Sequence, residues 1–335
     1  MTKAPTLEDV ANAAGVSTAT VSRCLNTPDK VVEETRTRVM AAVQALGYAP
    51  NFSARALVAK RTQTIGAVIP TMENAVFAEG IQAFQDVLQA KGFMLLIASS
   101  GYDPDAEAHA LRTLVARGAD GVLLIGFDRD DSVYDFLVTQ AIPAVVAWAH
   151  ADNGPLPSVG FDNAAAMEQL VTHAIDLGHA QVGIISGIQT GNDRARARIT
   201  GAQAALHRAG LSAATVVETS YGFLQGAEAL EQLLQTAPDV TLAICGNDVL
   251  AAGAVRRARM LGLSVPNDLS ITGFDDIGLA ELVDPPLTTV RVTHRAMGQA
   301  AAERILSLVT GKTADSLKLE AQLCLRDSLA KPHRP

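Results

Sequence analysis

Residues 6–26 read TLEDVANAAGVSTATVSRCLN, and this stretch decides the first part of the fold. Apolar residues recur at helical spacing over Leu7–Ala14, and Gly15 supplies the left-handed conformation that ends a helix cheaply. Ser17 is a typical N-cap for a second helix over Thr18–Leu25. The pattern predicts two short helices joined by a tight turn. This helix-turn-helix is the arrangement that places a second helix in the major groove of DNA.

Two further helices are expected directly after this motif. Residues Glu33–Leu46 form one, with Val39, Val43 and Leu46 as its buried stripe, and Phe52–Ala59 forms a short one. Four short helices within about 60 residues can bury only a very small core. We therefore expect a small module that is marginally stable by itself.

The pattern changes at Ile65, where short apolar runs begin to alternate with amphipathic stretches. The expected strands are Ile65–Pro70, Met94–Ala98, Gly121–Ile125, Ala144–Trp148, Val182–Ser186, Thr215–Thr219, Leu242–Cys245, Ser270–Gly273 and one around Leu317–Leu325. The expected helices are Val76–Lys91, Asp105–Arg117, Ser132–Gln140, Asn163–Leu177, Asp193–Ala209, Gly226–Gln235, Asp248–Leu261 and His294–Leu308. Continuous apolar strands alternating with helices indicate parallel sheets covered on both faces.

The fold class is therefore an N-terminal all-α helix-turn-helix domain with a fourth short helix, followed by an α/β domain of two lobes. The alternation restarts after the Pro-containing segment 153–157, which divides the lobes. The expected boundaries are 1–50 for the helix-turn-helix domain, 51–62 for the fourth short helix and linker, and 63–335 for the two-lobed domain. Its lobes comprise approximately 63–160 plus 291–320 and 161–290 plus the C-terminal strand.

Charge is distributed unevenly along the chain, whose net charge is −8. Residues 1–62 hold eight of the 27 Lys and Arg and five of the 35 Asp and Glu, so this part carries +3 and the rest −11. A basic module that touches phosphates beside an acidic sensor produces such an asymmetry.

Composition excludes several other classes. The apolar runs are too short to span a bilayer, and the first residues lack the apolar stretch of a secretory leader. Cys24, Cys245 and Cys324 lie far apart, which is typical of a reducing cytoplasm without disulfides. We expect a cytoplasmic protein that contacts no membrane.

Catalytic and metal motifs are missing from the sequence. The GKT at Gly311–Thr313 lacks the upstream glycine of a phosphate-binding loop, and the seven His have no metal-ligand spacing. We predict no enzyme activity, no catalytic residue, no metal and no cofactor. Three hypotheses remain: a ligand-controlled repressor, a periplasmic-type binding protein with the same lobes, and a sugar-processing enzyme with an unfamiliar site.

Polar and aromatic residues follow several predicted strands. Trp148 ends one strand and Asn247 and Asp275 follow two others. A helix after the strand at 182–186 opens with Arg194, Arg196 and Arg198. In open α/β sheets, ligands bind beyond the carboxyl ends of the strands. Flat aromatic faces with Arg and carboxylate groups suit a sugar or a sugar acid, which we expect between the lobes.

Longer stretches of the chain resemble the lactose-repressor (LacI/GalR) family. They include residues 6–26, EETRTRVMAAVQALGYAPN at 33–51, ARALVAKRTQTIGAVIP at 54–70, NDRARARITG at 192–201 and CGNDVLAAGAVRRARMLGLSVPNDLSITGFDD at 245–276. GYDP at Gly101–Pro104 and the VGFDN stretch also resemble the gluconate-repressor branch. The resemblance implies a transcriptional repressor that binds a palindromic operator as a homodimer and senses a small-molecule effector.

The resemblance also assigns DNA-contacting residues. Thr18, Ala19 and Arg23 match base-reading positions. The short helix expected at Phe52–Ala59 matches the family's hinge helix, in which Leu57 matches a leucine that wedges between base pairs in the minor groove. The remaining residues assigned to DNA contact are Thr6, Ser17, Thr20, Ser22, Asn26, Asn51, Ala54 and Arg55. Val58 departs from the family, because a basic residue usually follows the wedging leucine. Cys24 replaces a usual aliphatic residue, and we interpret it as a small core residue.

The resemblance also assigns the effector site. The family's effector positions match Phe77, Trp148, Arg198, Tyr221, Asn247 and Asp275, to which the pattern at the strand ends adds Arg196. Arg198 is expected to act as a fork for ligand hydroxyls or a carboxylate, and Asp275 to accept hydroxyl donors. The effector's identity, the operator sequence, the regulated genes and the sign of the effector's action stay open, as does the choice between dimer and tetramer.

Overall fold

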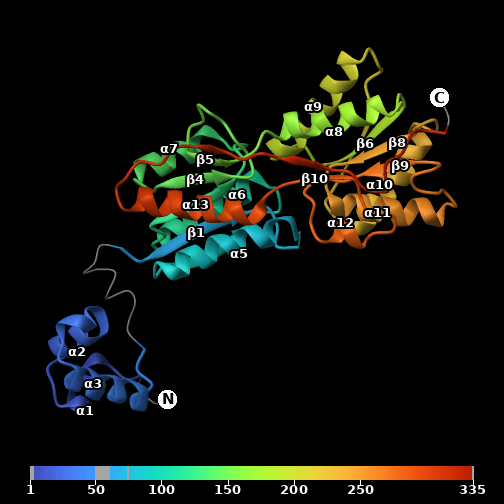
Figure 1. The fold of residues 1–335 in the computed structure, drawn as a ribbon. Helices are drawn as coiled ribbons and strands as arrows, with labels where there is room; N and C mark the ends of the chain where they lie inside the picture. Colours follow the sequence, from blue (N-terminus) through green and yellow to red (C-terminus); the bar gives the residue numbers. More distant parts are fainter. Residues whose placement is uncertain (1–3, 50–60, 74, 334–335) are drawn as a thin grey trace. The chain divides into compact units, whose positions relative to one another are not determined.

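The computed structural model describes residues 4–49, 61–73 and 75–333. The chain divides into two compact units, Met1–Thr62 and Gln63–Pro335, each of which is described by itself (Figure 1). Among the described residues, no helix is long and apolar enough to cross a membrane.

The N-terminal unit contains the predicted helix-turn-helix. Its helices are α1 (Leu7–Ala14), α2 (Thr18–Asn26), the 3-10 turn η1 (Pro28–Lys30) and α3 (Glu33–Leu46). Thr6 and Asp9 cap α1 reciprocally: Thr6 N–H donates to Asp9 Oδ2 at 2.8 Å, and Asp9 N–H donates to Thr6 Oγ1 at 3.3 Å. Gly15 ends α1 with φ 63°, a conformation that favours glycine.

A small apolar core holds these helices together. It consists of Val10, Ala11, Ala14, Val21, Cys24, Val39 and Ala42. Cys24 is buried in this core, as expected. The expected stripe of α3 is wrong at its end, because Leu46 is 39% exposed and Ala42 is buried instead. Val43 is partly buried and packs against this core, so α3 contacts the core through Val39, Ala42 and Val43. The helix expected at Phe52–Ala59 lies outside the described residues.

The first lobe of residues 63–335 is built on a six-stranded sheet of order β11-β5-β4-β3-β1-β2, in which the paired strands run parallel. Its strands are β1 (Thr64–Ile69), β2 (Met94–Ser99), β3 (Gly121–Ile125), β4 (Ala144–Ala147), β5 (Ser158–Gly160) and β11 (Leu317–Lys318). Its helices are α5 (Ala75–Ala90), α6 (Pro104–Ala116), α7 (Asp131–Thr139) and α13 (His294–Val309).

Alternating side chains of these strands explain why helices cover both faces. Ile65 and Ile69 of β1 pack into the core with α5 and α13, whereas Val68 packs with Leu111 of α6 and Leu137 of α7. Because successive side chains of a strand point to opposite faces, an uninterrupted apolar run needs a helix layer on each side. The alternation of the sequence therefore fixes this three-layer lobe.

The second lobe repeats the plan with a four-stranded parallel sheet of order β7-β6-β8-β9. Its strands are β6 (Val182–Gly187), β7 (Thr215–Thr219), β8 (Leu242–Cys245) and β9 (Ser270–Thr272). Its helices are α8 (Asn163–Asp176), α9 (Asp193–Arg208), α10 (Phe223–Thr236), α11 (Asp248–Met260) and the short α12 (Leu279–Leu282). Figure 1 shows α8 and α9 over one face of this sheet and α10 and α11 over the other.

The chain crosses between the lobes more than once, and the sequence pattern missed part of this. The strand expected around Leu317–Leu325 is two short strands, β11 beside β5 in the first lobe and β12 (Gln322–Cys324) beside β10 (Thr289–Arg291). β5, β10 and α12 were not predicted. β5 also keeps the chain in the first sheet beyond segment 153–157.

Candidate functional site

The helix-turn-helix presents polar side chains at the start of α2. Ser17 caps the helix, since its Oγ accepts from Thr20 N–H at 3.2 Å. Thr18, Ala19 and Arg23 are exposed. Within the described part of the chain, the Arg23 side chain takes part in no hydrogen bond or ion pair, so its donors stay available. An exposed, unpaired arginine on the second helix is what base readout in the major groove requires.

The other residues assigned to DNA contact fall into two groups. Thr6 caps α1, Thr20 and Ser22 are half-buried, and Asn26 is exposed with its Nδ2 donating to Ser22 Oγ at 3.2 Å. The hinge residues Asn51, Ala54, Arg55 and Leu57 lie outside the described residues, as does Val58.

In the second unit, six of the predicted effector residues line one hollow between the lobes. These six are Phe77, Trp148, Arg198, Tyr221, Asn247 and Asp275. The hollow lies at the carboxyl ends of strands from both sheets, as the crevice rule predicts. Only about 20 Å³ of it is open to the centre of a water molecule, which is roughly room for one water. A sugar-sized molecule therefore enters only after the lobes or the lining side chains move.

A closed circuit of hydrogen bonds forms the floor of this hollow and joins the lobes. Trp148 Nε1–H donates to His294 Nδ1 at 3.3 Å, so the His294 proton is on Nε2, which donates to Asp275 O at 3.3 Å. Asp275 Oδ1 accepts from Arg198 Nη2 at 3.2 Å, and Arg198 Nε donates to Asn163 Oδ1 at 2.9 Å. Asn163 Nδ2 closes the circuit by donating to Trp148 O at 3.0 Å. These interactions fix the lining side chains before any ligand arrives.

Trp148 and Asp275 occupy strained backbone conformations in this circuit. Their φ angles are 62° and 99°, in the region that favours glycine, and each side chain is 1% exposed. The Trp148 ring packs edge-to-face on Phe77 with 5.3 Å between centroids. Gly80 of α5 permits this position, because a Cβ at Gly80 would lie 2.7 Å from the Trp148 ring. Strained residues held by dense packing are typical of ligand sites.

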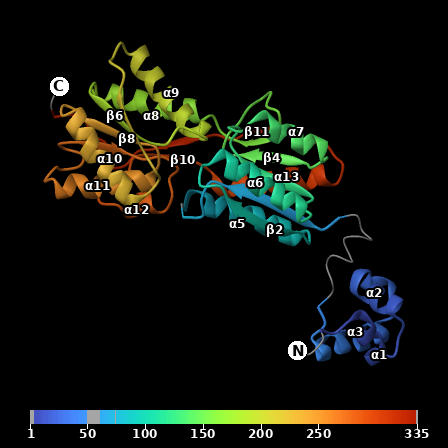
Figure 2. The same cartoon turned by 180° about the vertical axis from the view of Figure 1, so that it is seen from behind.

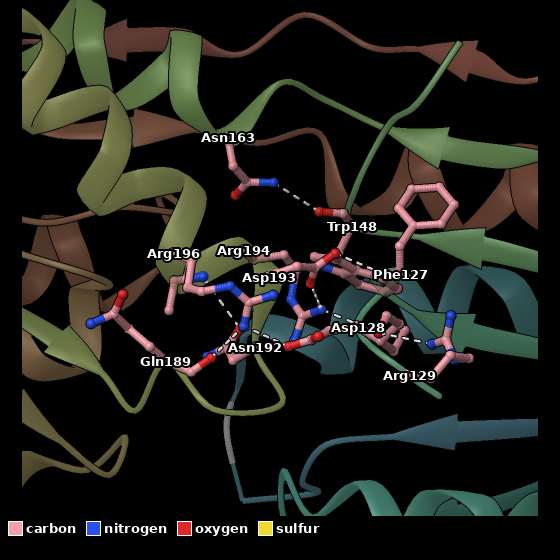
Figure 3. A network of polar contacts seen from close by, with 12 residues as sticks. Phe127, Asp128, Arg129, Trp148, Asn163, Gln189, Asn192, Asp193, Arg194 and Arg196 are labelled. Atoms are coloured by element: carbon pink, nitrogen blue, oxygen red, sulfur yellow. Dashed lines mark hydrogen bonds and ion pairs between the residues drawn. The ribbon is translucent and has the colours of Figure 1, made fainter. Parts of the chain in front are cut away.

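The predicted effector residue Arg196 is not part of the hollow. Its Nη1 donates to Asp128 Oδ2 and to Gln189 O, both at 2.6 Å (Figure 3). Beside it, Asp193 Oδ2 accepts from Phe127 N–H at 2.7 Å. Gly126, with φ 70°, precedes these first-lobe residues, and a Cβ there would overlap Arg194 and Asp193. Arg196 thus belongs to a latch between the loop 126–129 and the start of α9.

Four further residues line the hollow: Val76, Tyr102 and Asn192, which were not predicted, and Arg194, which was noted after a strand end but not assigned to the effector site. Tyr102 comes shortly after β2 and Asn192 shortly after β6. The same rule that selected Asn247, a polar residue following a strand, was therefore able to find both. Burial raises the pKa of Tyr102, so its hydroxyl stays neutral.

Two further polar groups near the hollow have unusual surroundings. Asn247 caps α11 by accepting from Leu250 N–H at 2.9 Å, while its buried Nδ2 has no partner among the described residues. Asp248 behind it is fully buried and accepts from Thr289 Oγ1–H at 2.6 Å and Ile277 N–H at 2.9 Å. Burial raises the pKa of Asp248 to about 8. Among the described residues, no cluster of three or more His, Cys, Asp or Glu is suited to a metal ion.

A larger hollow lies elsewhere, between α8 and the segment 318–323. About 1030 Å³ of it is open to the centre of a water molecule, but none of the predicted effector residues lines it. It is a wide groove rather than an enclosed site, and the convergent polar groups that select a ligand lie in the smaller hollow.

Comparison with known proteins agrees with this architecture. Residues 6–51 match the family model "Bacterial regulatory proteins, lacI family", and residues 62–327 match "Periplasmic binding proteins and sugar binding domain of LacI family". The chain belongs to the LacI family of bacterial regulatory proteins. It is a transcriptional regulator with a helix-turn-helix DNA-binding domain and a periplasmic-binding-protein-like domain.

Individual relatives cover nearly the whole chain. Catabolite control protein A of Priestia megaterium is 32% identical over 93% of this chain and 94% of its own length. The transcriptional regulator GntR of Escherichia coli K12 is 31% identical over 95% and 96%. A crystal structure of the Lac repressor dimer bound to operator and the anti-inducer ONPF has a TM-score of 0.85 and 28% identity, covering 98% of this chain and 100% of that one.

These relatives are regulators rather than enzymes, so the hypothesis of a sugar-processing enzyme is wrong. The match of residues 6–51 to the lacI-family model contradicts the hypothesis of a periplasmic-type binding protein. The resemblance to the gluconate branch is one of several of equal strength, because GntR and catabolite control protein A differ by only one percentage point in identity.

Proposed function

We propose that this chain is a repressor that binds a palindromic operator as a homodimer and is controlled by a sugar or sugar acid bound between its lobes. One observation carries the proposal: side chains from distant segments of both lobes converge on one hollow, at the edge where α/β proteins bind ligands. The regulator acts in the cytoplasm, where its operator DNA is found.

The DNA-binding residues act in two grooves. Thr18, Ala19 and Arg23 read bases in the major groove, while Ser17 and Asn26 contact phosphates. Asn51, Ala54, Arg55 and Leu57 form the hinge contact in the minor groove, where the Leu57 side chain wedges between base pairs. Two copies of this surface match the two halves of a palindrome.

Exposed apolar side chains support the homodimer. β2 is the edge strand of the first-lobe sheet (Figure 2), and Met94 and Ile97 on it are 56% and 37% exposed. In the second lobe, Phe223 and Leu224 of α10 and Leu282 of α12 are also exposed. Apolar surface on each lobe suits a second copy of the chain, so that a change in lobe orientation reaches both partners.

The effector acts by changing the relative orientation of the lobes. The circuit through Trp148 and Arg198 and the latch through Arg196 both cross the cleft, so a ligand between the lobes replaces some of these bonds. Rotation of the lobes in a dimer changes the spacing of the two hinge segments. The expected coupling is on the order of 1–3 kcal/mol.

A thermal-shift screen of the full chain against sugars, sugar acids and nucleosides tests the site. A ligand that binds only the folded state raises the melting temperature. Asn247→Ser is the informative variant, because Ser keeps the N-cap of α11 but removes the unpartnered Nδ2 donor. The proposal predicts that this variant folds but loses the shift. An equal shift in both proteins would place the ligand outside this hollow.

A further inference from the structure

Two arginines of α9, Arg194 and Arg198, line the same hollow, and each is only 7% exposed. Every nitrogen of Arg198 bonds to protein: Nε to Asn163, Nη2 to Asp275, and Nη1 to Gly246 O at 2.6 Å. Its guanidinium also stacks on Phe274 at 3.8 Å from the ring centroid. Arg198 therefore has few hydrogen-bonding positions left for a ligand.

Arg194 is bonded on one side only. Its Nη1 donates to Ile125 O at 3.1 Å and to Asp193 Oδ1 at 2.8 Å. Its Nε and Nη2 have no hydrogen-bond partner among the residues the structure describes. Figure 3 shows Arg194 beside Arg196 and Asp193, reaching from α9 toward the first lobe. These two nitrogens are not fully buried, so a ligand in the hollow that Arg194 lines can accept from them.

We infer that Arg194 is the specificity-determining residue of the hollow and that it selects an effector bearing a carboxylate. The inference rests on the proposed function, whose ligand site it makes specific. Nε and Nη2 are adjacent donors of a planar fork, and such a fork matches the two oxygens of a carboxylate. A hydroxyl group of a neutral sugar engages only one of them.

The other charges around the hollow favour a single negative charge on the ligand. Arg194, Arg198 and Asp275 line it, and Asp193 lies against Arg194. With two carboxylates already near the two arginines, a phosphate dianion meets more repulsion than a carboxylate does. Asn247 Nδ2, the second unpartnered donor, and the carboxylate of Asp275 remain for the ligand's hydroxyl groups.

Matched ligand pairs test this assignment by titration calorimetry on the full chain. Each pair shares a carbon skeleton and differs in the carboxylate: gluconate and glucitol, glucuronate and glucose, galacturonate and galactose. Gluconate 6-phosphate and glucose 6-phosphate test the phosphate alternative. We expect the wild type to bind one acid on the order of 10- to 100-fold more tightly than its neutral partner.

Arg194→Gln should remove this preference, and Arg194→Lys should keep only part of it, because Lys retains the charge but not the fork. Arg208→Gln is the matched control, since it removes a guanidinium from the other end of α9, outside the hollow and away from the bonds between the lobes, and it should keep the full preference. Melting temperatures of the three variants show whether each is folded.

Three outcomes would overturn the inference: equal binding of acid and neutral partner, an acid preference that survives Arg194→Gln in the folded protein, or binding of the phosphates alone. Binding of a neutral sugar without acid preference would leave the proposed function standing. Failure of every member of the panel to bind the wild type would contradict the sugar-type effector itself.

Discussion

In residues 1–62, the described side chains assigned to DNA come from α2, its cap and the cap of α1, and most of them are exposed. In residues 63–335, the side chains of the cleft come from segments as far apart as Phe77 and His294, and most are bonded to one another. An exposed reading surface keeps its hydrogen-bonding capacity for DNA. A buried site uses most of that capacity to hold its own shape and leaves only a few groups for the ligand.

The largest expected effect is on the pH dependence of stability, because the two units differ in whether they bury a carboxyl group. Every described Asp and Glu of residues 4–49 is exposed, whereas Asp248 is buried with a pKa of about 8. The folded chain therefore holds this proton up to about pH 8, while the unfolded chain releases it near 3.8. The resulting stability is present at acid pH and is lost as pH rises toward 8, by roughly 1.4 kcal/mol per pH unit.

Denaturant unfolding between about pH 5 and pH 8 measures this slope. Asp248→Asn keeps the shape of the side chain without the titration, so its profile should be flatter by that amount. Parallel profiles for the wild type and the variant would contradict the buried proton.

Contact between the lobes predicts the next largest effect. Gly126→Ala places a Cβ where Arg194 and Asp193 lie, which should disfavour the closed lobes by about 2–3 kcal/mol. Small-angle scattering should show a larger radius of gyration. Gly92→Ala is the control, since Gly92 also has a positive φ, of 78°, but open space at its Cβ. A similar expansion in both variants would show that backbone strain, not contact between the lobes, is responsible.

The exposed surface of the small unit predicts an effect of about 1–3 kcal/mol on DNA binding alone. Arg23→Ala should weaken operator binding by about 10- to 100-fold, with a much smaller loss on random DNA and unchanged ligand binding. Arg38→Ala, an exposed arginine of α3, is the matched control. Equal losses of affinity for operator and random DNA would show that Arg23 contacts phosphates rather than bases.

The cap of α1 predicts the smallest effect. Thr6→Ala removes the Oγ1 that accepts from Asp9 N–H and donates to Asp9 Oδ2, while the bond from Thr6 N–H to Asp9 Oδ2 can persist, and it should destabilise residues 1–62 by about 1 kcal/mol. Thr6→Ser should restore most of this stability. Hydrogen exchange of amides in α1 measures the change, and amides of residues 63–335 serve as the internal reference. Equal protection of the α1 amides in Thr6→Ala and the wild type would show that the side-chain cap adds no stability to α1.

The same contrast explains what was predictable from sequence. The helix-turn-helix is local, so caps and spacing over residues 6–26 revealed it. The lobes were predictable because each long strand and helix has its own periodicity. Leu46 was misjudged because apolar spacing along α3 does not show whether Ala42 or Leu46 faces the core. The C-terminal strand was misjudged because its two halves pair with different strands of the fold.

In the cleft, residue type alone did not distinguish Arg194, Arg196 and Arg198, which alternate along one helix turn. The structure separates them by their partners: Arg198 is saturated by protein, Arg196 reaches Asp128, and Arg194 keeps two nitrogens free among the described residues. Those partners come from β3, α8 and the loops after β3, β6, β8 and β9, which only the folded chain brings together.

Coupling between the cleft and DNA is the central claim, and one measurement tests it directly. The full chain selects its operator from random duplex DNA, and fluorescence anisotropy then gives operator affinity with and without a ligand from the thermal-shift screen. The account predicts a palindromic operator whose affinity changes by about 5- to 150-fold on ligand binding, with no change in Asn247→Ser. A ligand that binds the cleft of the wild type but leaves its operator affinity unchanged would contradict the account.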